Sequence, residues 1–202
     1  MPRATQILRQ SRKAVEDLNL LKVLRSEISQ ELSSNSFQDE QNGSLGDFVL
    51  EWNSSQSQDV VLRRKGESGE EVAVSALLSR ETYYTEGIFP RKVLMKVCVK
   101  KPGLSSILQF HCGVFEKGVR RSDFNIHGAY LQSMTIPTSS VYRGPSFSTL
   151  DPQLQDELKE YLVARGIGED LTNFLLLTLH KKEECQYLDW LQKLESFVAK
   201  DE

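Results

Sequence analysis

The sequence predicts an α+β fold, with a single antiparallel sheet, one N-terminal helix and two C-terminal helices. Three observations favour this class: apolar residues at steps of three and four near both ends, alternating apolar and polar residues between them, and short turns that join the alternating stretches. Strand follows strand without helical crossovers, so antiparallel pairing is expected. The residues alone suggest six or seven strands, all of them between the two helical ends.

An amphipathic helix of about five turns is expected near the N-terminus. Its apolar stripe consists of Val15, Leu18, Leu21, Leu24, Ile28 and Leu32. The polar run Ser33-Ser34-Asn35-Ser36 ends it. Residues 1–14 form a basic N-terminal segment with four bases and no acid. This segment is either a remnant of a mitochondrial targeting sequence or a basic, partly disordered N-terminus, and residues 15–202 are expected to form a single α+β domain.

The clearest strand lies around residues 92–100, where an apolar face alternates with lysines. Val93, Met95, Val97 and Val99 form the apolar face, and Lys92, Lys96 and Lys100 occupy the other. Similar alternation occurs in Phe48–Trp52, Val60–Leu62, Val72–Ala76 and Leu108–Val114, and Phe124–Met134 supplies at least one more strand. Glycine-containing turns separate several of these stretches, as in Lys65–Glu70, Lys101–Gly103 and Glu116–Gly118.

Two helices are expected at the C-terminal end. Asp151 and Pro152 form a helix start, because aspartate caps free amide groups and proline at the first position loses no needed donor. Gly166 closes that helix, whose apolar residues are Leu154, Leu158, Tyr161 and Leu162. The second helix is far longer. Its apolar face and that of the N-terminal helix are expected to pack against each other and against the sheet.

The long C-terminal helix carries a large aromatic and apolar ridge. Its members are Tyr187, Trp190, Leu191, Leu194 and Phe197. A single chain of 202 residues has little need of so much apolar surface at one end, and large apolar patches usually indicate an interface. The sequence therefore predicts helix packing or contact between copies of the chain at this ridge.

The net charge of −3 conceals an uneven distribution. Residues 91–121 hold eight bases and one acid, whereas residues 16–90 and 151–202 carry net charges of −8 and −6. The bases of this middle region are Arg91, Lys92, Lys96, Lys100, Lys101, Lys117, Arg120 and Arg121. They are interpreted either as a track for a nucleic-acid phosphate backbone, with Lys92, Lys96, Lys100 and Lys101 as contacts, or as a solvated sheet face that resists edge pairing.

No catalytic, cofactor or metal site is expected. His111 and Cys112 are adjacent on a strand and so point to opposite faces, with Cys112 on the buried side. His180 is expected at the surface, and the three scattered cysteines indicate free thiols in a reducing compartment. Nucleophile-elbow, phosphate-loop and dinucleotide motifs are missing, and no apolar run is long enough for a membrane span. An enzyme, a small-molecule substrate and membrane insertion are therefore not expected.

The C-terminal part of the sequence resembles the mitochondrial acidic matrix protein family, also called the mitochondrial glycoprotein family. The residues that carry the resemblance include Tyr142, Gly144-Pro145, Phe147, Leu150-Asp151, Leu154-Gln155, Tyr161-Leu162, Arg165-Gly166-Ile167, Leu171, Phe174-Leu175, Lys182-Glu183, Tyr187-Leu188, Trp190-Leu191, Leu194 and Phe197. The resemblance implies a highly twisted sheet of about seven strands and a doughnut-shaped homotrimer with a central channel.

The same resemblance implies a function in the mitochondrial matrix. It suggests a non-catalytic, chaperone-like protein that binds several protein ligands and RNA, and that supports the mitochondrial ribosome, mitochondrial translation and oxidative phosphorylation. Glu169, Asp170, Glu183 and Glu184 are the expected contributors to an acidic binding surface. The alternative, from the residues themselves, is a nucleic-acid-binding protein that uses the basic sheet face.

Overall fold

The computed structural model describes residues 2–34, 44–82, 91–118, 121–133, 142 and 144–199. The chain divides into two compact units. Residues 40–182 form what we call the sheet unit, and residues 1–39 together with 183–202 form the helix-pair unit. A single domain over residues 15–202 stays a prediction.

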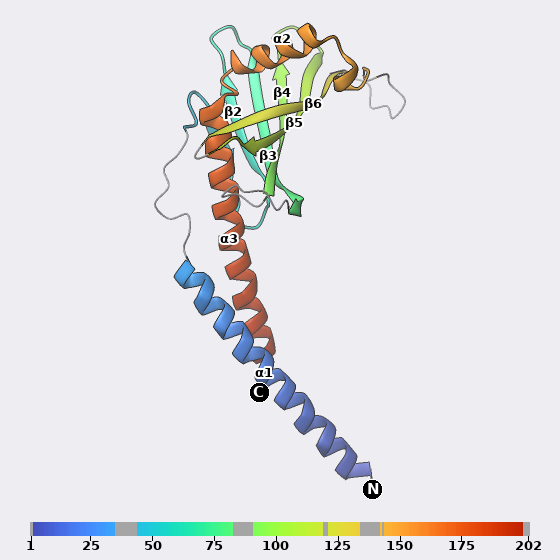
Figure 1. Cartoon of the computed structure of the whole chain (residues 1–202), viewed down its shortest axis with the longest axis vertical. Helices are drawn as coiled ribbons and strands as arrows, with labels where there is room; N and C mark the ends of the chain where they lie inside the picture. The colour runs from blue at the N-terminus through green and yellow to red at the C-terminus, as the bar shows by residue number, and fades with distance from the viewer. Residues whose placement is uncertain are drawn as a thin grey trace. The chain divides into compact units, whose positions relative to one another are not determined.

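The sheet unit contains one antiparallel sheet whose described strands follow chain order, β1-β2-β3-β4-β5-β6. Figure 1 shows these strands side by side, with α2 and the first half of α3 packed beside them. The described residues contain six strands, against about seven expected: β1 (Val49–Trp52), β2 (Val60–Lys65), β3 (Glu71–Thr82), β4 (Arg91–Lys100), β5 (Ser106–Glu116) and β6 (Ser122–Ser133). The predicted α+β class and antiparallel meander are confirmed.

Alternation along β4 explains how the sheet acquires two different faces. Val93, Met95, Val97 and Val99 are buried, while Lys92, Lys96 and Lys100 lie on the opposite face, which we call the outer face. The predicted turn between β2 and β3 closes with a hydrogen bond from Gly66 N to Glu70 O of 2.8 Å. β1 differs from the inner strands, because all four of its residues are exposed and only the preceding Phe48 is buried.

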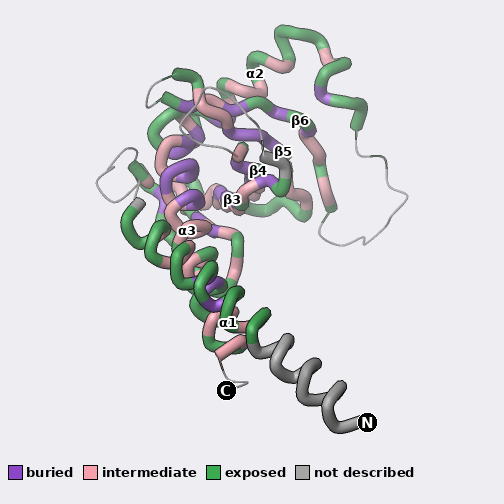
Figure 2. The backbone as a smooth tube through the Cα atoms, turned by 60° about the horizontal axis from the view of Figure 1, so that its bottom comes forward, coloured by how far each residue is buried: buried purple, intermediate pink, exposed green. Residues whose placement is uncertain are grey.

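The core lies between the inner face of the sheet and the helices that follow it. Leu162 from the end of α2 (Pro152–Val163), Ile167 from the connection that follows, and Leu171 and Leu175 from the start of α3 (Glu169–Ala199) join the strand residues in one buried cluster. The short helix η1 (Phe147–Thr149) adds Phe147. Figure 2 shows buried backbone concentrated in the strands and in the first half of α3.

Both predicted caps of α2 are confirmed. Asp151 Oδ1 accepts a hydrogen bond from Gln153 N at 2.9 Å, with Pro152 at the first helical position. After Val163 the chain turns through Gly166, whose φ of +84° suits glycine, and Ile167 N donates to Leu162 O at 3.1 Å. Arg165 beside this turn packs over the Tyr161 ring and donates to Glu70 Oε2 at 2.9 Å, which joins α2 to the β2–β3 turn.

The helix-pair unit consists of α1 (Pro2–Ser34) and the part of α3 after Lys182. α1 has 33 residues and begins well before Val15, so the helix is longer than the predicted one. Leu21 and Leu24 are buried, and the pair is joined by Arg25 Nε to Glu195 Oε1 at 2.8 Å and Tyr187 OH to Glu27 Oε1 at 3.1 Å. The ends of the α1 stripe, Val15, Leu18 and Leu32, remain exposed.

Candidate binding surfaces

The predicted basic residues of β4 lie together on the outer face of the sheet. Lys92 and Lys96 are exposed and Lys100 is half-buried, and all three alternate with buried valines and Met95. Lys101 is exposed in the turn that follows. Lys96, Lys100 and Lys101 form no hydrogen bond or ion pair with another residue of the described part of the chain. These lysines therefore present ammonium groups that a ligand can contact.

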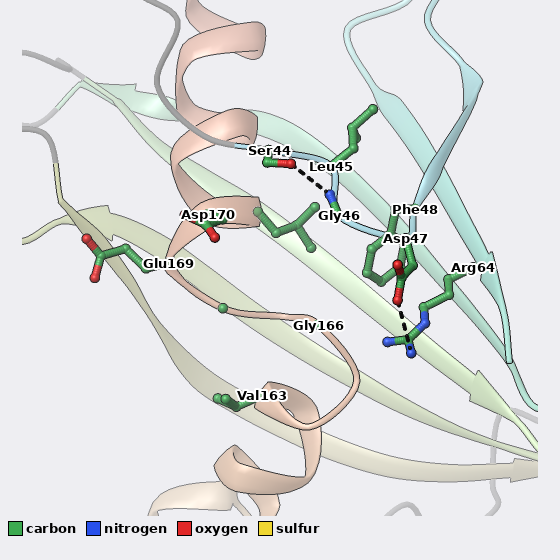
Figure 3. A pocket seen from close by; sticks show the side chains of 12 residues that line it. Ser44, Leu45, Gly46, Asp47, Phe48, Arg64, Val163, Gly166, Glu169 and Asp170 are labelled. Carbon is green, nitrogen blue, oxygen red and sulfur yellow. Dashed lines mark hydrogen bonds and ion pairs between the residues drawn. The ribbon is translucent and has the colours of Figure 1, made fainter.

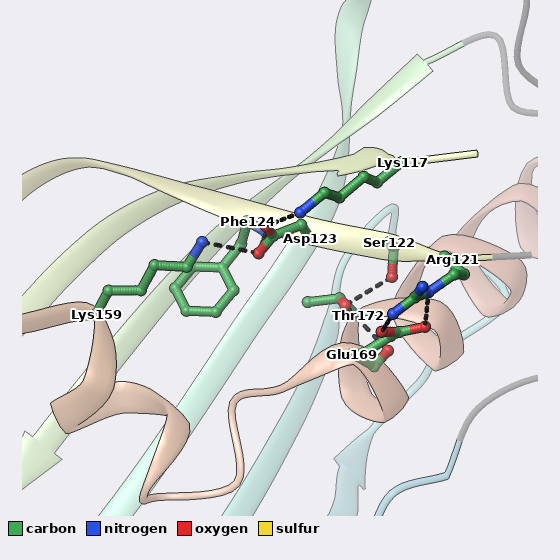
Figure 4. Close-up of polar contacts among 8 residues, drawn as sticks. All are labelled: Lys117, Arg121, Ser122, Asp123, Phe124, Lys159, Glu169 and Thr172. Atoms are coloured by element: carbon green, nitrogen blue, oxygen red, sulfur yellow. Dashed lines mark hydrogen bonds and ion pairs between the residues drawn. The ribbon is translucent and has the colours of Figure 1, made fainter. Parts of the chain in front are cut away.

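The remaining bases of the predicted track are used within the protein. Arg121 Nε and Nη2 donate to the two Glu169 carboxylate oxygens at 3.1 and 3.2 Å, and Lys117 pairs with Asp123 Oδ2 at 3.5 Å (Figure 4). Arg91 donates to Ser79 O at 3.3 Å. Arg120 lies outside the described residues. The basic surface that the structure presents is thus centred on β4 and is narrower than the sequence suggested.

These contacts at the start of β6 also join the sheet to both C-terminal helices. Lys159 of α2 donates to Asp123 Oδ1 at 2.9 Å, and the Ser122 hydroxyl lies 2.6 Å from that of Thr172 in α3. Burial works to raise the pKa of Asp123. The hydrogen bonds from Lys159 and the Phe124 amide, together with the nearby lysine charges, outweigh burial and lower that pKa.

The four acids of the predicted acidic surface are divided between the two units. Glu169 and Asp170 form the first turn of α3 in the sheet unit, whereas Glu183 and Glu184 belong to the helix-pair unit. The hydrogen bonds from Arg121 lower the pKa of Glu169, so this carboxylate is already engaged. Asp170 is exposed, and its backbone carbonyl accepts a hydrogen bond from Ser44 N at 3.3 Å.

A pocket of about 400 Å³ lies where the α2–α3 connection meets the segment before β1 (Figure 3). Its lining includes Phe48, Arg64, Gly166 and Asp170, and the Arg64 guanidinium lies 3.4 Å from Asp47 Oδ2. The volume falls in the range of small-ligand sites. The hydrogen bond of the Ser44 hydroxyl in this lining is the one that it accepts from Gly46 N at 3.1 Å, and no described base contacts that hydroxyl. Sequence analysis did not predict this pocket.

The predicted ridge of the helix-pair unit is largely exposed in a single chain. Leu191 is only 3% exposed, whereas Trp190 is 55% and Phe197 78% exposed. Tyr187 and Trp190 stack with ring centroids 6.0 Å apart and an interplanar angle of 18°. Leu194 is half-buried. Packing with α1 therefore covers Leu191 and leaves a pair of large aromatic side chains partly in water.

Within the described residues, no three His, Cys, Asp or Glu side chains form a group that could hold a metal ion. Cys112 is buried as expected, and burial raises its pKa to about 12, which keeps the thiol protonated. The surface position expected for His180 is wrong: it is only 3% exposed, and its Nδ1 lies 2.8 Å from Leu176 O. His180 follows Leu176 by one helical turn, so it shares the apolar face that packs into the core.

A group of polar and aromatic side chains on β5 and β6 was not predicted from the sequence. Gln109 Nε2 lies 2.7 Å from His111 Nε2, and the His111 and Tyr130 rings are 5.0 Å apart in an edge-to-face arrangement. Cross-strand pairing of His111 with Gly128, and of Gln109 with Tyr130, brings them to the outer face beside the β4 lysines. The β5–β6 register is irregular between His111 and Cys112, so strand alternation alone could not predict which side chains meet here.

The twisted single sheet, helices on its inner face and a helix pair define a class of α+β proteins with exposed charged and aromatic surfaces. A family model described as "Mitochondrial glycoprotein", MAM33, matches residues 90–198, more than half of the chain. The chain belongs to the mitochondrial glycoprotein (MAM33) family. The predicted resemblance is confirmed.

Two curated relatives are similar to this chain. The mitochondrial acidic protein mam33 of Schizosaccharomyces pombe is 32% identical over 111 residues, which are 50% of this chain and 39% of that protein. The chain thus spans well under half the length of this relative. An uncharacterised mitochondrial protein of Arabidopsis thaliana is 23% identical over 192 residues, which are 89% of this chain and 74% of that protein. These names support a mitochondrial location.

Two solved structures share the fold. The crystal structure of the Trypanosoma brucei p22 protein has a TM-score of 0.68 at 20% identity, covering 91% of this chain and 99% of that one. A Leishmania major protein of unknown function, described as a sequence homologue of human p32 protein, has a TM-score of 0.68 at 18% identity with the same coverage. Among the described helices, none combines the length and the apolar run that a bilayer crossing needs.

Proposed function

We propose that this protein is a non-catalytic, homotrimeric binding protein of the mitochondrial matrix, which recruits or chaperones other proteins. The observation that carries the proposal is the exposed Trp190–Phe197 ridge, because large apolar side chains left in water are typical of interaction surfaces. Membership of the mitochondrial glycoprotein family supports it. The stacking of Tyr187 on Trp190 holds the ridge in one arrangement and so reduces the entropy lost on binding.

The ridge is proposed to join copies of the chain. When a patch on one copy binds a different patch on the next copy, the copies form a closed ring if the rotation between neighbours allows it. A threefold ring is one such closed assembly. Exposed apolar residues of α1, namely Val15, Leu18 and Val23, offer a complementary surface in the same unit. The doughnut-shaped homotrimer with a central channel is part of this proposal.

Partner proteins are proposed to bind through the acidic residues. Asp170 is exposed, whereas the nearby Glu169 is paired with Arg121, so Asp170 is a more accessible contact than Glu169. Glu183 and Glu184 of the helix-pair unit are further proposed contacts. Opposite charge on a partner speeds its association and favours it over wrong partners. The mitochondrial ribosome is among the proposed partners, and support of mitochondrial translation and of oxidative phosphorylation would follow from that contact.

A matched pair of variants tests this binding role. The full chain is expressed in mitochondria with an affinity tag, and co-purified proteins are identified for D170N/E183Q/E184Q and for the control D156N/E157Q/E160Q. The control removes three exposed carboxylates from α2 and so changes the net charge equally. We expect the first variant alone to lose captured proteins, including ribosomal ones. Identical protein sets for wild type and both variants would contradict the proposal.

A second candidate function is nucleic-acid binding by the basic outer face. The observation in its favour is that Lys96, Lys100 and Lys101 form no ion pair with described residues. Phosphate contacts release counterions, so the affinity should fall steeply with salt. K96E/K100E in a filter-binding assay with RNA should abolish retention, while K193E on α3 should not. Unchanged retention by K96E/K100E would reject this candidate.

A further inference from the structure

The outer face of β5 and β6 is unusual because two glycines lie beneath ring-bearing side chains. A Cβ atom at Gly113 would lie 2.6 Å from His127 Nε2, and one at Gly128 would collide with the Tyr130 hydroxyl. Only glycine therefore permits these two side chains to fold back over the strands. The rings lie across the surface of the sheet instead of standing away from it.

These rings remain accessible from the outer face. His127 is exposed, and His111 and Tyr130 are half-buried. The edge-to-face contact of His111 with Tyr130, and the 2.7 Å contact of His111 with Gln109, hold them in fixed positions. The result is a preorganised surface of π systems beside an amide group that offers both a donor and an acceptor.

The lysine row of β4 borders this surface directly. Lys96 pairs across the strands with His111, which in turn pairs with Gly128. Lys92, Lys96 and Lys100 are spaced four residues apart on one face, so the row extends over roughly 26 Å at the rise of a β-strand. A row of positive charge of this length suits an extended polyanion.

We propose that the outer face binds single-stranded nucleic acid, with the lysines on phosphates and Tyr130, His127 and His111 against unpaired bases. This inference rests on the second candidate function above and adds its ligand class and the residues that select it. Aromatic rings beside a basic row are the arrangement that sequence-tolerant single-strand binding requires. A duplex keeps its bases stacked on one another, so it has no free base faces to offer.

Fluorescence anisotropy with labelled oligouridine and with a duplex of equal length tests the proposal, from about 50 mM to about 200 mM salt. We expect the single strand to bind more tightly than the duplex. Y130L and H127L should each weaken oligouridine binding by about 5- to 150-fold with the salt slope unchanged. Y130F should retain the affinity, and W52L, which removes an exposed aromatic ring from β1 at the opposite edge of the sheet from β6, should have no effect.

Substitution of the lysines, by contrast, should change the salt dependence of binding. K96Q/K100Q should reduce the slope of log affinity against log salt by about 1.4, or about 0.7 for each charge. Ultraviolet crosslinking of oligouridine to the unmodified chain gives a second readout that does not depend on any variant folding. Crosslinks are expected in the β6 segment that contains His127 and Tyr130.

Failure of this inference differs from failure of the candidate function. Oligouridine binding that responds to K96Q/K100Q but not to Y130L or H127L, with crosslinks outside β6, would overturn the stacking surface and leave nucleic-acid binding in place. Equal affinity for the duplex would also overturn it. Absence of oligouridine binding at the lowest salt would contradict both the stacking surface and the nucleic-acid-binding function.

Discussion

Replacement of Trp190 by alanine probes the proposed contact between chains. Trp190 is 55% exposed, and a tryptophan side chain offers about 200 Å² for burial, so roughly 110 Å² remains in water in a single chain. At about 25 cal/mol per Å², covering that area stabilises an interface by about 2.7 kcal/mol. W190A should therefore weaken each contact between chains about 100-fold.

The same substitution also removes area that is already buried within the chain. The covered part, roughly 90 Å², corresponds to about 2 kcal/mol, in addition to the contact with Tyr187. The two effects separate by assay. Denaturant unfolding at low protein concentration reports the loss within the chain, and mass photometry across a dilution series reports the dissociation constant of the assembly.

Trp52 supplies the matched control. It is 52% exposed on β1, in the sheet unit, and its indole donates to Ser57 Oγ at 3.0 Å. W52A removes the same side chain at nearly the same exposure but away from the ridge. We expect the dissociation constant to rise for W190A alone. Equal shifts for both variants, or no shift for W190A, would refute the assignment of the interface to the ridge.

Three further predictions concern stability. L175A, at a fully buried position in α3, should cost about 2–5 kcal/mol in a denaturant melt, whereas L154A, 46% exposed in α2, should cost less than about 1 kcal/mol; similar losses would contradict the described core. Because the pKa of Asp123 is lowered in the folded state, its ion pairs stabilise that state fully above the ordinary pKa of 3.8 and are lost as the pH falls through the lowered pKa. D123N should therefore reduce the free energy of unfolding at pH 7 and match wild type in acid. A difference in that free energy that stays constant with pH would contradict this. Burial lowers the pKa of His180 below its ordinary value of 6.5, so unfolding takes up a proton and the free energy of unfolding should fall as the pH drops below 6.5. H180Q should flatten this pH dependence. An unchanged slope of unfolding free energy against pH in H180Q would contradict the assignment to His180.

Much of the sheet unit is predictable from local sequence patterns. The period-two alternation around Val97 gave the two faces of β4, and Asp151 with Gly166 gave both ends of α2, because these signals act within a few residues. The start of α1 was not predicted. The segment before Val15 was interpreted only from its basic composition, as a targeting remnant or a disordered N-terminus, although nothing inside it breaks a helix. Local patterns thus identify elements better than they identify their ends.

The candidate surfaces were less predictable because they depend on pairing between distant residues. Lys96 was placed correctly on one face by alternation, but its neighbour His111 meets Tyr130 only through the β5–β6 register and its irregularity. Arg121 was included in the predicted basic track, but in the fold it pairs with Glu169, which lies 48 residues later in the chain. His180 was wrongly expected at the surface, although its spacing of four residues from Leu176 places it on the apolar face of the helix.

The mass of the unmodified chain in solution tests the central claim most directly. Sedimentation velocity at micromolar concentration should give a single species of about 69 kDa, which is 3 × 23.0 kDa. Aromatic side chains that are exposed in one chain would then be covered by the next. A species of 23.0 kDa that persists as the concentration is raised would contradict the proposed self-assembly.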